Sequence, residues 1–198
     1  MLTINQTVSK VALLLSLVLM FDATAESFRK YKQHTRFDSH FRKYSKRYFG
    51  VAFNWHYFKA QAVAESNLNP DAQSRVGAQG IMQIMPSTYA EIQRKHRVID
   101  GGVMEPRWNI AAAIWYNKTL FDFWRKDRTL IERLRFMFAS YNAGKGNLLK
   151  AQRQAINVGL NPRQWHSVRQ VLNKVTGKHS RETIGYVDRI EQVVKEIQ

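Results

Sequence analysis

Apolar residues recur at helical spacing along most of this chain, and this periodicity constrains its fold more than any other feature. Residues three and four positions apart share one face of an α-helix, so such repeats predict helices with one buried face. Alternation of apolar and polar residues, which is typical of strands, does not occur over any convincing length. The helical pattern covers residues 53–66, 86–96, 107–125, 128–142, 144–157, 162–174 and 180–197. The sequence therefore predicts a mainly α domain.

A further helix is indicated nearer the N-terminus, where aromatic and basic residues are interleaved. Four aromatic residues recur at helical spacing between lysines and arginines, namely Phe37, Phe41, Tyr44 and Tyr48. Aromatic rings among cations can stack on nucleic-acid bases, but this spacing favours an amphipathic helix that buries the rings and exposes a basic face. We expect residues 26–36 to form a basic N-terminal arm and residues 37–198 to form one domain.

The first residues have the features of a secretory signal. Lys10 precedes a largely apolar run from Val11 to Phe21, and Ala23-Thr24-Ala25 has the small-residue pattern of a cleavage site. The run is short for a bilayer span, which needs about 20 residues. We therefore expect residues 1–25 to be a cleavable signal peptide, with an uncleaved membrane anchor as the alternative.

The cysteine content and the net charge restrict the cellular compartment of the protein and the class of partner that it binds. The chain has no cysteine, which excludes a disulfide framework, a thiolate nucleophile and a lipid anchor on a cysteine of this chain. Export without disulfides fits a bacterial periplasm. The formal net charge of +16 at pH 7 indicates an anionic partner, whether nucleic acid, anionic lipid or cell-wall polymer. Export argues against nucleic acid, whereas the carboxylates of a cell-wall polymer have the required charge.

Glu65 is the strongest candidate for a catalytic residue. Helical spacing leads from Trp55 to this residue, and Asn67, Asn69 and Pro70 then end the helix, which places Glu65 in its last turn. The unpaired carbonyl groups of a helix end and apolar surroundings both disfavour a charged carboxylate, so we expect a raised pKa. A raised pKa suits a general acid near neutral pH. The alternative is a solvated glutamate at a helix end.

The residues after this helix are typical of a tight turn followed by a new helix. Gly77 and Gly80 suit a backbone that glycine adopts most easily, and Pro86 is a helix-starting residue. The six histidines form no metal-ligand pattern with a carboxylate, and the chain has no G-x-S-x-G motif. We therefore expect neither a metal site nor a cofactor.

Four short motifs, taken together and in order, resemble the lytic murein transglycosylases that have a lysozyme-like catalytic domain. They are Glu65-Ser66, the run from Gly77 to Pro86, Ala139-Ser140-Tyr141-Asn142-Ala143-Gly144 and Glu182-Thr183-Ile184-Gly185-Tyr186-Val187. The chain looks closest to the F-type, membrane-associated enzymes. The resemblance implies a mainly α, lysozyme-like helical domain with a substrate cleft, exported to the periplasm. It leaves open an association with the outer or inner membrane or with a secretion machine.

The resemblance also implies a reaction and a role for individual residues. Members of this family cleave the β-1,4 bond between N-acetylmuramic acid and N-acetylglucosamine in peptidoglycan without hydrolysis, and they leave a 1,6-anhydromuramoyl end. By position, Glu65 would be the acid and then the base. Seven residues would bind the glycan strand, namely Ser74, Gln83, Met85, Tyr141, Asn142, Glu182 and Tyr186. For Tyr141 the alternative is a buried tyrosine with one hydrogen bond, and for Glu182 it is a residue of a helix N-terminus.

Two other functions stay open at this point. A hydrolytic, goose-type-like muramidase on the same fold ordinarily uses a second carboxylate, and Asp71, in a turn, is the only other acid between Glu65 and Glu91. A wall-binding or scaffold protein without turnover would not need the whole set of motifs. The sequence does not decide whether the protein serves wall recycling, a secretion or conjugation machine, or a phage.

Overall fold

The computed structural model describes residues 28–198, so the signal peptide expected at residues 1–25 lies outside the described part of the chain. The helices are α2 (Asp38–Phe49), α3 (His56–Ser66), α4 (Pro86–Lys95), α5 (Pro106–Phe123), α6 (Leu130–Ala143), α7 (Lys145–Asn157), α8 (Trp165–Val171), α9 (Asn173–Thr176) and α10 (Ser180–Ile197). A short 3-10 helix, Gly177–His179, joins α9 to α10. The described residues form no sheet, and isolated bridges join Gln79 to Gln73 and to Ile84. The predicted mainly α fold is confirmed.

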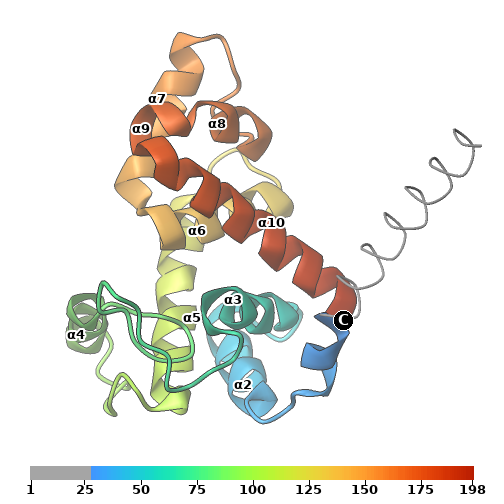
Figure 1. Cartoon of the computed structure of the whole chain (residues 1–198), viewed down its shortest axis with the longest axis vertical. Coiled ribbons are helices and arrows are strands. Elements are labelled where there is room, and N and C mark those ends of the chain that lie inside the picture. The colour runs from blue at the N-terminus through green and yellow to red at the C-terminus, as the bar shows by residue number, and fades with distance from the viewer. Residues whose placement is uncertain (1–27) are drawn as a thin grey trace, which may run out of the picture.

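Helix α10 runs across the molecule and connects two groups of helices (Figure 1). The group α7, α8 and α9 lies at its N-terminal end, and α2 and α3 lie toward its C-terminal end. Helix α10 packs against α3 and α6, and α5 packs against α2 and α6. Their core is apolar and includes Phe58 of α3, Ile110 of α5, Phe136 of α6 and Ile190 of α10, all fully buried. This packing brings the end of α3 against α10.

The predicted helices are present, and two of them differ from the prediction in a way that has a local explanation. The helix predicted from residue 53 begins at His56, because the Oδ1 atom of Asn54 accepts a hydrogen bond from the backbone N–H of His56 at 3.0 Å and so satisfies an N-terminal donor. The helix predicted over residues 162–174 is divided into α8 and α9 at Leu172. The backbone of Leu172 keeps helical angles (φ −60°, ψ −31°), so the division is an interruption of the hydrogen-bond pattern.

The basic segment expected at residues 26–36 packs against the domain from residue 28 onward. Residues 28–33 are helical, and Tyr31 is buried, with its hydroxyl group donating to Oδ1 of Asn67 at 2.8 Å. The Nζ atom of Lys32 donates to the backbone carbonyl group of Gln198 at 2.7 Å. The two ends of the described chain therefore lie side by side, as Figure 1 shows.

The structure also bears on membrane spans and metal ions. Across residues 28–198, none of the helices combines the length and the apolar character that a membrane crossing requires. In the same range, no group of three or more histidine, aspartate and glutamate side chains is arranged so that it could hold a metal ion.

Candidate active site

Glu65 lies in the last turn of α3, as the sequence predicts, because the helix ends directly after it. Asn67 adopts left-handed backbone angles (φ 55°, ψ 35°), which stop the helix. The side chain of Asn67 accepts hydrogen bonds from the hydroxyl group of Tyr31 and from the guanidinium group of Arg189, both at 2.8 Å. Ser66 donates to a backbone carbonyl group of the following loop at 2.8 Å. These contacts fix the end of α3 and, with it, the position of Glu65.

The loop of residues 67–85 forms one wall beside Glu65 and is held in place by Asn109 of α5. The fully buried side chain of Asn109 accepts a hydrogen bond from the backbone N–H of Met82 at 2.8 Å and donates to two backbone carbonyl groups. Gly80 in this loop has a φ of 76°, and a Cβ atom there would lie 2.6 Å from Nδ2 of Asn109. The prediction that this glycine serves tight backbone geometry is confirmed.

Glu65 and all seven residues predicted to bind substrate line one cavity of about 620 Å³. Its walls come from the end of α3 with the loop 67–85, from the C-terminal end of α6 and from the first part of α10. Ligand sites in proteins usually have volumes of about 300–1,000 Å³. Motifs that lie far apart in the sequence therefore converge on one cavity with room for a ligand.

The environment of Glu65 favours the neutral form of its carboxyl group. The pKa of Glu65 is raised from 4.5 to about 8, chiefly because burial disfavours the charged carboxylate. The hydrogen bond from Tyr186 acts in the opposite direction, and the negative charge of Glu182 adds to the rise in pKa. The rise predicted from the sequence is present, with burial rather than the helix end as its main cause. Such a group is protonated at neutral pH and can donate its proton as a general acid.

A chain of hydrogen bonds leads from the core to this carboxyl group. Tyr186 of α10 donates to Oε1 of Glu65 at 2.5 Å. The hydroxyl oxygen of Tyr186 accepts from Nε2 of Gln61 at 3.0 Å, and Oε1 of Gln61 accepts from Nδ2 of Asn117 at 2.7 Å. Gln61 lies in α3, Asn117 lies in α5, and both side chains are fully buried. We refer to Asn117, Gln61 and Tyr186 as the amide chain.

A second carboxylate, Glu182, lines the same cavity. It lies one turn before Tyr186 on α10, and its side chain is 68% exposed. Asn142, at the end of α6, donates to Oε1 of Glu182 at 3.5 Å and accepts a hydrogen bond from the hydroxyl group of Thr183 at 2.7 Å. The observation that no second acid lies near Glu65 therefore holds along the sequence but not in the fold, because α10 returns to the end of α3.

Three of the predicted residues line the cavity while their polar groups also bond to the protein. The hydroxyl group of Tyr141 donates to the backbone carbonyl group of Met82 at 2.8 Å. The Oγ atom of Ser74 accepts a hydrogen bond from a backbone N–H of the loop at 2.9 Å, and Nε2 of Gln83 donates to two loop carbonyl groups at 2.9 and 3.0 Å. Tyr141 can still accept and Ser74 can still donate one hydrogen bond to a ligand. Met85, which is 39% exposed, adds apolar surface.

Sequence reasoning missed Arg189, which also lines the cavity and is its one cationic residue among those described. It follows Tyr186 by three positions and Glu182 by seven, a spacing that places the three side chains on one face of α10. That periodicity could have identified Arg189. For Gln61 and Asn117 no comparable signal exists, because nothing in the sequence pairs a residue of α3 with a residue of α5.

Comparison with known proteins gives a family match. Residues 41–161, more than half of the chain, match the family model described as the transglycosylase SLT domain. Two curated relatives are named membrane-bound lytic murein transglycosylase F: that of Desulfosudis oleivorans is 34% identical over 146 residues, and one from Haemophilus influenzae is 30% identical over 133 residues. The crystal structure of the 70 kDa soluble lytic transglycosylase from Escherichia coli superposes with a TM-score of 0.62 at 25% sequence identity.

These similarities cover most of this chain and a smaller part of each relative. The alignment with the Desulfosudis protein covers 71% of this chain and 30% of that protein, and the alignment with the Haemophilus protein covers 67% and 26%. The superposition covers 82% of this chain and 24% of the Escherichia coli chain. The chain thus spans about a quarter to a third of the length of the proteins that it matches.

Proposed function

Because the chain belongs to the transglycosylase SLT family, we propose that it cleaves the glycan strands of peptidoglycan by transglycosylation. The bond that it cleaves is the β-1,4 bond between N-acetylmuramic acid and N-acetylglucosamine, and the product carries a 1,6-anhydromuramoyl end. Glu65 is the catalytic residue, and the seven residues that share its cavity bind the strand. The names of the curated relatives, which refer to murein, support this substrate.

The observation that carries this proposal is that the carboxyl group of Glu65 lies at a cavity with room for a ligand, in surroundings that raise its pKa. Its pKa of about 8 leaves it protonated at neutral pH. The cavity of about 620 Å³ presents hydroxyl, amide and carboxyl groups, which suit the hydroxyl and N-acetyl groups of a sugar. A protonated acid beside sugar-binding groups is the arrangement that glycosidic bond cleavage requires.

In the proposed mechanism one carboxyl group transfers a proton twice. Glu65 first donates its proton to the glycosidic oxygen as the bond from that oxygen to C1 of the muramoyl residue breaks. The carboxylate then accepts the proton of the muramoyl C6 hydroxyl group, whose oxygen forms the new bond to C1. Glu65 ends in its initial protonated state, and no water is consumed. The C6 hydroxyl group competes well with water because the sugar ring already holds it near C1.

The proposal includes export to the periplasm, where the polymer lies. The apolar run at residues 11–21 and the small residues after it support an exported protein. The net charge of +16 supports an anionic polymer as partner, since the peptide stems of peptidoglycan carry carboxylates. The two relatives are named membrane-bound, and an association of this chain with a membrane or a secretion machine is a separate hypothesis.

The direct test is digestion of purified peptidoglycan by the wild-type protein and by Glu65→Gln. The amide keeps the shape of the side chain but cannot transfer the proton, so we expect turnover to fall by about 10²- to 10⁴-fold in a folded variant. Glu196→Gln, which removes a carboxylate outside the cavity, is the matched control and should retain activity. Wall-degrading activity in a folded Glu65→Gln protein would refute the assignment of the acid.

Hydrolysis is the second candidate, and the exposed carboxylate of Glu182 in the same cavity favours it. A carboxylate in that position can orient a water molecule as a general base. Mass spectrometry of the released muropeptides separates the two reactions, because an anhydro product is lighter by one water than a product with a reducing end. We expect anhydro products from the wild-type protein and from Glu182→Gln. Predominantly reducing ends that disappear in Glu182→Gln would establish hydrolysis instead.

A further inference from the structure

We propose that Gln61 and Asn117 are positioning residues that keep the hydroxyl group of Tyr186 turned toward Oε1 of Glu65 and thereby hold the acid proton on Oε2. This inference rests on the proposed function, because it concerns the acid of that reaction. It assigns a role to two fully buried residues that belong to none of the sequence motifs.

The direction of the amide chain follows from which atoms can donate. The Nε2 atom of Gln61 can donate a hydrogen bond but cannot accept one, so the hydroxyl oxygen of Tyr186 accepts from it at 3.0 Å. The one hydrogen of Tyr186 is then directed to Oε1 of Glu65, at 2.5 Å. Oε1 must stay an acceptor, since a proton on it would meet the hydrogen of Tyr186. The proton of neutral Glu65 therefore resides on Oε2, the oxygen left for the substrate.

Asn117 sets which end of the Gln61 amide faces Tyr186. Its Nδ2 atom donates to Oε1 of Gln61 at 2.7 Å, so the carbonyl end of Gln61 faces Asn117 and the amino end faces Tyr186. With Gln61 reversed, Tyr186 could donate to Gln61 and Glu65 would lose its donor. Reversal would also leave a buried amino group of Asn117 unpaired. The observed direction leaves its Oδ1 atom unpaired within the described residues, and proteins tolerate unpaired carbonyl oxygens more often than unpaired N–H groups.

Burial strengthens the hydrogen bonds of the amide chain. Gln61 and Asn117 have no exposed surface and Tyr186 has 8%, so water does not compete for these bonds, and hydrogen bonds are stronger in such surroundings. Other ionisable groups line the same cavity as Glu65, namely Glu182 and Arg189 from α10 and Tyr141 from α6. Substitutions at Gln61 and Asn117 leave those groups in place. A change in the pKa of Glu65 on such a substitution therefore reports on the amide chain.

The test is titration of Glu65 in Gln61→Leu and in the double variant Gln61→Leu/Asn117→Leu. The carboxyl resonance of Glu65 is followed by NMR in protein labelled with ¹³C at glutamate, and it is identified by its loss in Glu65→Gln. The double variant removes both amides and leaves neither partner of that bond unpaired, so we expect the fold to be retained. We expect the pKa of Glu65 to rise by about one unit in both, because the hydroxyl group of Tyr186 is no longer held as a donor to the carboxylate.

Three further variants distinguish positioning from packing. Tyr186→Phe should raise the pKa of Glu65 by a similar amount, and adding Gln61→Leu to it should raise the pKa no further, because Gln61 acts through Tyr186. The exchanged pair Gln61→Asn/Asn117→Gln keeps two amides facing each other and should return the pKa toward the wild-type value. Kinetics on peptidoglycan should show kcat lowered by about 3- to 10-fold in Gln61→Leu with little change in KM.

An unchanged pKa of Glu65 in the folded double variant, or additive shifts for Gln61→Leu and Tyr186→Phe, would overturn the inference. So would an exchanged pair that titrates like Gln61→Leu. The titration needs no substrate, so it decides the role of the amide chain even if digestion fails. Absence of wall cleavage by the wild-type protein would instead count against the proposed function.

Discussion

At the scale of single residues, the neutral form of Glu65 links stability to pH. Its pKa in the folded protein, about 8, lies above the ordinary value of 4.5, so the folded state binds this proton more tightly than the unfolded state does. The resulting stabilisation is fully present below pH 4.5 and is lost as the pH rises through 8. Each unit of pKa difference corresponds to about 1.4 kcal/mol, and the partial exposure of Glu65 reduces the total.

We therefore expect the wild-type protein to lose on the order of 2–4 kcal/mol of unfolding free energy relative to Glu65→Gln between about pH 5 and about pH 9. Urea unfolding of both proteins across this range measures the difference. Glu196→Gln should follow the wild-type curve, because its carboxylate lies outside the cavity. Parallel curves for the wild-type protein and Glu65→Gln would mean that the pKa of Glu65 is not raised by folding. Under the proposed function, kcat/KM should also fall above about pH 8, where the acid is ionised.

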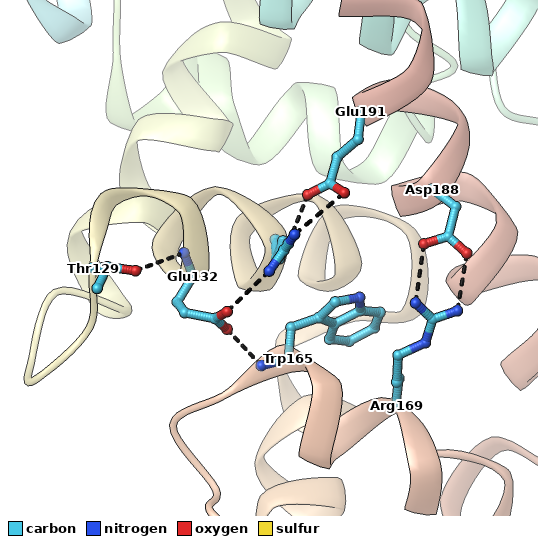
Figure 2. Close-up of polar contacts among 7 residues, drawn as sticks. Thr129, Glu132, Trp165, Arg169, Asp188 and Glu191 are labelled. Atoms are coloured by element: carbon cyan, nitrogen blue, oxygen red, sulfur yellow. Dashed lines mark hydrogen bonds and ion pairs between the residues drawn. The ribbon is translucent and has the colours of Figure 1, made fainter. Parts of the chain in front are cut away.

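At the scale of helices, side-chain hydrogen bonds and ion pairs connect α6, α8 and α10 (Figure 2). Arg135 of α6 donates to both carboxylate oxygens of Glu191 on α10, at 2.6 and 3.4 Å, and to Glu132 at 3.1 Å. The other oxygen of Glu132 accepts a hydrogen bond from the backbone N–H of Trp165, the first residue of α8. Arg169 of α8 pairs with Asp188 of α10 through two hydrogen bonds. Helix α10, which carries Tyr186, is thereby fixed against α6.

The hydrogen bonds of Glu132 and the ion pair between Arg169 and Asp188 should contribute differently to stability, because their side chains differ in exposure. The side chain of Glu132 is 15% exposed, whereas those of Arg169 and Asp188 are 34% and 48% exposed. We expect Glu132→Gln to lower the unfolding free energy by about 1–3 kcal/mol, since it weakens charge-assisted bonds to Arg135 and α8. Asp188→Asn, the matched control at a surface pair, should cost less than about 1 kcal/mol. Urea unfolding measures both values, and equal losses would contradict the assignment of Glu132 as the stronger link.

Much of the helical framework was predictable because it depends on local spacing. The period of apolar residues marked the helices, and the stop at Asn67 placed Glu65 in the last turn of α3. The four motifs indicated the family, which the match to residues 41–161 confirms. Most of the predicted cavity residues were found because the motifs contain them. Ser74 was assigned by its position in the resemblance, outside the four motifs, and Arg189, which was missed, shares the face of Tyr186 on α10.

Other features depend on contacts between helices, and no local pattern in the sequence reveals those contacts. Asn109 holds the loop 67–85 through hydrogen bonds that span 27 to 30 positions of the chain. Gln61 meets Asn117 and Tyr186 only because α3 lies against both α5 and α10. For the same reason, only the family resemblance, and no local spacing, assigned Glu182 to the site of Glu65. Side-chain pairs between elements follow from how the helices pack, and no local pattern reports that packing.

At the scale of the whole molecule and under the proposed function, we expect the net charge of +16 to govern binding to the wall polymer. Attraction between exposed charges is screened by salt, and the screening length falls from about 10 Å at 0.1 M to about 3 Å at 1 M. We expect the fraction of Glu65→Gln protein that sediments with peptidoglycan sacculi to fall several-fold when salt is raised from about 0.05 M to about 0.5 M. This variant is used because it leaves the polymer intact. Binding that does not change with salt would mean that the charge serves another partner.

The hydrogen bond between Tyr186 and Glu65 joins positions 121 residues apart in the chain, and its consequence concerns the history of each molecule. Before folding, Glu65 is an ordinary glutamate that is ionised at neutral pH and has no proton to give. Helix α10, which completes its surroundings, follows all the other described helices in the chain, so it is synthesised after them. Under the proposed function, a newly made chain is therefore harmless to the glycan until α10 has docked. Under that function, folding itself would control when the activity appears.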